Sequence, residues 1–166
     1  AIGPKVNDAF TAVNRFLAAG ERVSRTTAAV EIGETTWPAG TFLVAAGDVT
    51  HARVEETARA LGLRISALGS TPSVDTAPLS RPRVGLYHAW GGNMDEGWTR
   101  WVLEQFEFDY AQLHDAEIRA GDLAEAYDVI VLPDASYSSM LRGLSADRMP
   151  AEYAGGMTIR GAASLY

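Results

Sequence analysis

The chain has 166 residues, of which 47% are hydrophobic and 21% charged, and it carries a formal net charge of -7 at pH 7. These values are typical of an ordinary globular protein, and the length suits one domain or two small ones. The acidic balance, without a basic run, argues against a nucleic acid or an anionic membrane as partner. The absence of cysteine excludes disulfides, thiolate metal sites and a cysteine nucleophile within these residues.

Residues 1–68 are predicted to form a small α+β segment. Apolar residues at helical spacing, followed by Gly20, predict an amphipathic helix over residues 7–19. Thr50 is expected to cap a second helix that ends at Gly62. Short apolar and β-branched runs predict strands over residues 22–27, 29–32, 41–45 and 63–67.

Residues 69–82 (GSTPSVDTAPLSRP) include three prolines and few apolar residues. Proline lacks a backbone donor and restricts the residue before it, so this stretch is predicted to be a linker or an extended surface crossing. It is the expected boundary between residues 1–68 and 83–166.

Residues 83–166 alternate between strand and helix patterns. Strands are predicted over residues 84–87, 110–113 and 127–132, the last as a buried interior parallel strand. Asn93 is expected to begin a helix in a capping box with Glu96, and a helical turn is expected within residues 116–123. Helical spacing predicts that one stripe of this first helix is buried, made of Trp98, Trp101, Val102 and Phe106. The alternation predicts an α/β fold with a parallel sheet.

In such sheets, ligands bind where strands end. The candidate ligand-binding residues are therefore His88, Trp90, Asn93 and Ser136, which follow the predicted strands. A phosphate is not expected at the Gly91-Gly92 turn, because Asp95 and Glu96 would repel it and no complete phosphate-binding glycine motif is present.

Other chemistry finds little support in the sequence. The three histidines, His51, His88 and His114, lack the spacing of familiar zinc hydrolases. Ser136 and its neighbouring serines lack a nucleophile elbow, and a polar loop is the favoured interpretation. No catalytic residue, metal ligand or cofactor is therefore predicted in this chain.

Three stretches carry a family resemblance: residues 83–106 (RVGLYHAWGGNMDEGWTRWVLEQF), residues 115–134 (DAEIRAGDLAEAYDVIVLPD) and residues 149–156 (MPAEYAGG). They resemble the C-terminal region of large bacterial proteins of the zinc carboxypeptidase family, and residues 7–44 resemble the stretch that precedes it. In that family the peptidase domain lies upstream. Its His-x-x-Glu pair and third His have no counterpart here, so zinc is expected only in the parent peptidase domain.

The C-terminal region itself resembles a class I glutamine amidotransferase-like domain, which implies a flavodoxin-like parallel sheet flanked by helices. In true amidotransferases one strand ends in Pro-Gly-Gly, and a later strand leads to the catalytic cysteine. Here Pro133 is followed by Asp134 and Ala135 instead of the glycines. The nucleophile strand would follow Tyr166, so the domain at residues 83–166 is expected to be truncated at its C-terminus.

Three functions stay open. The first is a noncatalytic accessory domain of a zinc carboxypeptidase-like hydrolase, whose partners are the parent protein's other domains or a second copy in a homo-oligomer. The second is a small-molecule or carbohydrate-binding module that uses the four residues named above. The third is an incomplete amidotransferase-like enzyme half. The resembled proteins are usually exported, which implies an exported or periplasmic location.

Overall fold

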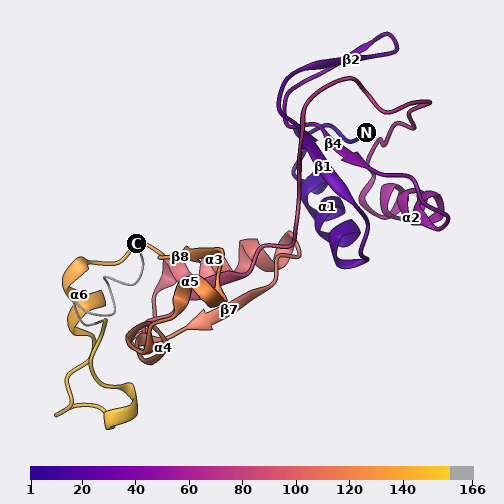
Figure 1. Cartoon of the computed structure of the whole chain (residues 1–166). Helices are drawn as coiled ribbons and strands as arrows, with labels where there is room; N and C mark the ends of the chain where they lie inside the picture. Colours follow the sequence, from indigo (N-terminus) through magenta and orange to yellow (C-terminus); the bar gives the residue numbers. More distant parts are fainter. Residues whose placement is uncertain (158–166) are drawn as a thin grey trace. The chain divides into compact units, whose positions relative to one another are not determined.

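The computed structural model describes residues 1–157 and divides the chain into two compact units, coloured by sequence in Figure 1. The first unit comprises residues 1–81 together with residues 106–108. The second unit comprises residues 82–105 and the described residues from 109 onward. Helices and strands are mixed in both units, which confirms the predicted α/β character in its coarse form. Within the described residues, no helix is long and apolar enough to cross a membrane.

The first unit packs helices against a small antiparallel sheet. The sheet has the order β4-β1-β5, and a separate hairpin joins β2 to β3. Figure 1 shows α1 beside β1. The elements are α1 (Asp8–Ala18), β1 (Val23–Thr26), β2 (Val30–Ile32), β3 (Thr35–Trp37), β4 (Phe42–Val44), α2 (Thr50–Leu61) and β5 (Thr76–Pro78).

The core of the first unit forms where the apolar face of α1 covers β1 and β4. Its buried members are Ile2, Ala9, Ala12, Val13, Phe16, Val23 and Phe42. The predicted helix over residues 7–19 and the strands around 22–27, 29–32 and 41–45 are confirmed, with shorter bounds. Periodicity located the helix and the strands around residues 22–27 and 41–45 because each contributes buried side chains to this core.

Several predictions for the first unit were wrong in detail. No strand forms over residues 63–67; Leu63 and Ile65 instead pack against the core from irregular backbone. Thr50 is the first helical residue of α2 rather than its cap, and its hydroxyl donates to Glu21 at 2.7 Å. The Thr50 hydroxyl, which the sequence pattern predicted to cap the helix, therefore bonds to a carboxylate distant in the sequence. The proline-containing stretch at residues 69–82 includes β5, which pairs with β1.

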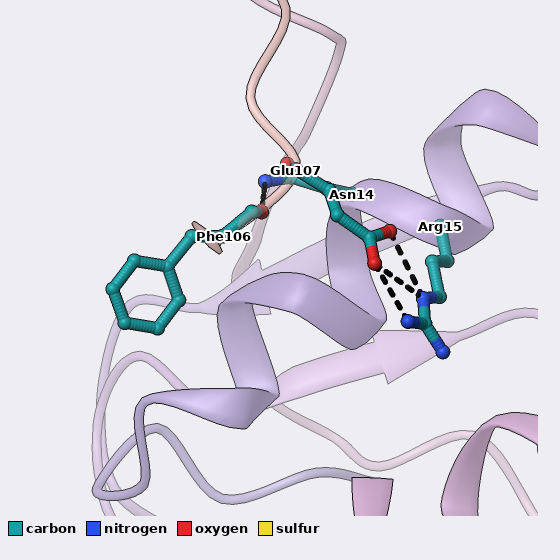
Figure 2. A network of polar contacts seen from close by, with 4 residues as sticks. All are labelled: Asn14, Arg15, Phe106 and Glu107. Carbon is teal, nitrogen blue, oxygen red and sulfur yellow. Dashed lines mark hydrogen bonds and ion pairs between the residues drawn. The ribbon is translucent and has the colours of Figure 1, made fainter. Parts of the chain in front are cut away.

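Residues 106–108 are held on α1 by a polar network (Figure 2). The side-chain amide of Asn14 donates to the carbonyl oxygen of Phe106 at 2.8 Å. The Arg15 guanidinium donates to both carboxylate oxygens of Glu107, with the shortest contact at 2.6 Å, and this holds the pKa of Glu107 below its ordinary value. Phe106 therefore belongs to the first unit and not to the predicted tryptophan stripe.

The second unit is built on a parallel sheet of order β7-β6-β8. The strands are β6 (Val84–Tyr87), β7 (Tyr110–Leu113) and β8 (Val129–Val131). The helices are α3 (Met94–Gln105), α4 (Asp115–Ala120), α5 (Leu123–Ala126) and α6 (Tyr137–Arg142), with a 3-10 turn, η1, at Ala151–Tyr153. The middle strand β6 is buried along its whole length. Side chains of Tyr87, Leu113, Ile118, Leu123 and Met157 form the core.

Two burial predictions for the second unit were wrong. β8 is an edge strand and not an interior one, because among the described residues it pairs only with β6, and Val129 is 48% exposed. The stripe on α3 points to solvent: Trp98 is 61% exposed and Trp101 52%, and their rings meet edge to face with centroids 6.1 Å apart. The buried residue of α3 is Glu96. The helix is turned so that a carboxylate, and not the tryptophans, is removed from solvent.

Candidate functional site

The candidate site lies at the carboxyl edge of the parallel sheet. His88 directly follows β6, His114 directly follows β7, and Asp134 and Ser136 follow β8. Because the three strands are parallel, these positions lie at one edge, where α/β sheets bind their ligands. Residues from different loops also contact one another at this edge.

The most unusual contact is that between His88 and Glu96. His88 Nδ1 lies 3.0 Å from Glu96 Oε1, and the two side chains are 25% and 3% exposed. Both atoms are removed from water, yet neither makes a well-aligned hydrogen bond. Glu96 was predicted to close a capping box with Asn93. In the structure its carboxylate is instead placed against the imidazole at the end of the middle strand.

Aromatic side chains surround a second histidine. The Trp90 ring stacks on the His114 ring, with centroids 3.7 Å apart and planes within 5°. Tyr153 meets Trp90 edge to face at 4.8 Å, and His88 meets His114 edge to face at 5.2 Å. His114 Nδ1 lies 2.7 Å from the carbonyl oxygen of His88. Trp90 is 37% exposed, so part of its ring reaches solvent while the stack holds the β6–α3 loop against the end of β7.

Asn93 and Ser136 act at the beginnings of helices. Asn93 Oδ1 accepts from the backbone N–H of Asp95, and its side-chain amide donates to the carbonyl oxygen of Asp134 at 2.7 Å. Ser136 Oγ accepts from the backbone N–H of Ser139, as an N-cap of α6. Asn93 therefore ties the loop after β6 to the loop after β8. The predicted polar loop at Ser136 is in fact the beginning of a helix.

A buried polar pair lies next to these residues, where β6 meets α4. The Tyr87 hydroxyl donates to Asp115 Oδ1 at 2.8 Å, and both residues are buried. Burial raises the pKa of Asp115, although the hydrogen bond from Tyr87 opposes this rise. Burial and the Asp115 hydrogen bond also raise the pKa of Tyr87. The pair joins the middle strand to the helix that follows β7.

The structure thus brings the four predicted residues to one edge in two sets. His88 and Trp90 share the ring of His114, whereas Asn93 and Ser136 serve the loop after β8. Sequence reasoning missed Glu96 and Tyr153 as members of the site. His114 could have been predicted by the rule that selected His88, because it is also a polar residue directly after a strand.

Metal binding has no donor set here. Within residues 1–157, no three His, Asp or Glu side chains gather closely enough to hold a metal ion. In the first unit, His51 and Glu55 lie 3.3 Å apart on the exposed face of α2. An open hollow of about 550 Å³ also lies in the first unit, lined by Thr27, Ala28, Pro72, Ser73, Val74 and Asp75.

Comparison of the chain with protein-family models, curated proteins and solved structures finds no match. The resemblance to zinc carboxypeptidases and to amidotransferase-like domains therefore stays a prediction.

Proposed function

We propose that the second unit is a noncatalytic module that binds a small polar molecule at the carboxyl edge of its sheet. In this proposal the unit is an accessory domain of a zinc carboxypeptidase-like hydrolase, and its partners are the parent protein's other domains. A flavodoxin-like fold is part of this proposal. Across the sheet, the order β7-β6-β8 places the second strand of the unit first, the first strand in the middle and the third strand last. The first three strands of flavodoxin-like sheets have the same 2-1-3 order, which supports that assignment.

The observation that carries the binding function is the buried pair of His88 and Glu96. Removing a carboxylate and an imidazole from water costs several kcal/mol per charged group unless the geometry and the hydrogen bonds are excellent. Here Nδ1 and Oε1 lack well-aligned hydrogen bonds. An apolar residue at position 96 would avoid this cost. Polar groups kept at such a cost, at the ligand-binding edge of an α/β sheet, are typical of functional sites.

The test compares stability with ligand response. A thermal-shift screen of a metabolite library against the whole chain should give at least one compound that raises the melting temperature. The double variant His88→Leu/Glu96→Leu should be as stable as the unmodified chain or more so, because well-packed apolar residues often replace a buried ion pair without loss. The same variant should no longer respond to the compound. Glu125→Gln, on α5 at the amino end of β8, is the matched control and should respond normally.

Two results would count against this function. A screen without a hit would remove the evidence for a binding site, and a double variant that still responds would place the site elsewhere. The noncatalytic role has a separate test. If the metal-loaded chain hydrolysed peptides, and a chelator stopped the turnover, the accessory role would be wrong.

A further inference from the structure

We propose that the ligand of this site is a cation that carries a protonated amine, and not a phosphate or a carboxylate. This inference rests on the proposed binding function and names its ligand class. It is unusual for the position, because helix N-termini after parallel strands commonly bind anions.

Carboxylates follow every strand of the parallel sheet. Asp95 and Glu96 follow β6, Asp115 and Glu117 follow β7, and Asp134 follows β8. The segments that hold them, residues 88–96, 114–117 and 132–136, contain no Lys or Arg. The carboxylates in the first turns of α3 and α4 oppose the positive ends of those helices. This edge therefore repels anions and attracts cations.

The buried pair of His88 and Glu96 favours the same class of ligand. Glu96 is 3% exposed, and its Oε1 faces His88 Nδ1 at 3.0 Å without a well-aligned hydrogen bond. A carboxylate on one ring nitrogen favours the tautomer with its proton on that nitrogen. In neutral His88 the other nitrogen, Nε2, is then a hydrogen-bond acceptor. The imidazole keeps a partly exposed surface. An ammonium N–H can donate to this acceptor, and its positive charge is the sign that the edge attracts.

The charge of the whole second unit acts in the same direction. Residues 82–105 and 109–157 contain five arginines and no lysine, against twelve aspartates and glutamates, which gives a net charge of -7. The basic residue of α4, Arg119, uses its guanidinium to donate to the carbonyl oxygen of Gly156. Such an excess of one sign raises the local concentration of oppositely charged small molecules.

The test uses matched molecules that differ only in charge. The whole chain is titrated at low salt with 1,4-diaminobutane, 1,4-butanediol and succinate, and with glucosamine, glucose and glucose 6-phosphate. The readout is the chemical shift of the His88 ring protons in NMR spectra, assigned with His88→Ala. We expect at least one amine to shift these signals and to bind about tenfold tighter than its neutral counterpart. The two anions should leave the signals unchanged.

Two charge-removing variants test whether Glu96 attracts the amine. Glu96→Gln should weaken amine binding about tenfold, whereas Glu125→Gln, the same charge change at the opposite edge of the sheet, should leave it unchanged. Circular dichroism checks that each variant is folded. If Glu96→Gln does not fold, Asp95→Asn, an exposed change on the same helix turn, should weaken binding by about twofold.

The failures of the two proposals are distinguishable. Tighter binding of an anion, equal binding of amine and neutral molecules, or no shift of His88 by any of the six molecules would overturn the cation assignment. Hits from the metabolite screen that depend on His88 would leave the binding function intact in each case. A screen without hits would instead remove the binding function itself.

Discussion

Replacing Gly85 by alanine tests the packing between the sheet and the core of the second unit. Gly85 lies in the middle of β6, and a Cβ atom added there would meet Leu113 Cδ1 at 2.5 Å, Leu113 Cγ at 3.2 Å and Tyr127 Cδ1 at 3.3 Å. Carbon atoms in favourable contact lie about 3.5–4.0 Å apart, so the new methyl group overlaps its nearest neighbour by at least about 1 Å. Leu113 is 1% exposed, and it cannot move without disturbing the core.

The expected loss follows from two opposing terms. Overpacking a tight core costs about 1–3 kcal/mol. Alanine also restricts the unfolded chain more than glycine does, which stabilises by about 0.4–1 kcal/mol. We therefore expect Gly85→Ala to lower the free energy of unfolding of the second unit by about 1–2 kcal/mol. With a urea slope of about 1 kcal/mol/M for so small a unit, the unfolding midpoint should fall by about 1–2 M.

The assay is urea unfolding followed by tryptophan fluorescence. In a Trp37→Phe background the remaining tryptophans, at positions 90, 98 and 101, all belong to the second unit. Gly97→Ala is the control, because its Cβ would meet no atom within 4 Å inside α3, and it should stabilise by about 0.5–1 kcal/mol. Leu113→Val removes the clashing atom. The double variant Gly85→Ala/Leu113→Val should therefore lose about 1 kcal/mol less than the sum of the single variants.

Two outcomes would refute this reasoning. If Gly85→Ala were as stable as the unmodified chain, the close contact with Leu113 would be wrong. If the effects of Gly85→Ala and Leu113→Val on the free energy of unfolding were additive, the destabilisation by Gly85→Ala would not come from its contact with Leu113.

Four further predictions concern the second unit. Tyr87→Phe leaves the buried Asp115 carboxylate without its hydroxyl donor and should destabilise by about 1–3 kcal/mol in urea unfolding, whereas Asp115→Asn keeps an acceptor and should not. Burial raises the pKa of Asp115, so the stability that this group contributes is present below its ordinary pKa of 3.8 and is lost as pH rises through the raised pKa. Asp115→Asn should therefore remove this fall of the free energy of unfolding with rising pH. An unchanged pH dependence would contradict the prediction. The Arg83 hydrogen bonds lower the pKa of Asp128 to about 2, so this contribution is present above the ordinary value of 3.8 and is lost as pH falls through about 2; acid titrations of Asp128→Asn should lack that loss. Gly143→Ala places a Cβ 1.6 Å from a backbone oxygen at a residue with φ +58°, and amide exchange over residues 140–157 should accelerate about 100-fold; unchanged exchange would contradict the close backbone approach.

Local sequence patterns were enough to predict where most helices and strands lie. The helix α1 and the strands β6 and β7 were predicted close to their bounds, because periodicity and turn residues are local signals. The position of the candidate site also followed from the sequence, since His88 comes directly after a strand and parallel strands share one functional edge.

Local patterns could not predict which helix faces are buried or which polar groups meet. Helical spacing shows that Trp98 and Trp101 share a face, but it does not show whether that face points to the sheet. In the structure, Glu96 on another face of α3 lies against His88, and the tryptophans point to solvent. The pairing of β5 with β1 likewise joins segments about fifty residues apart. Such contacts depend on the free energy of packing the whole unit, which a local sequence pattern does not contain.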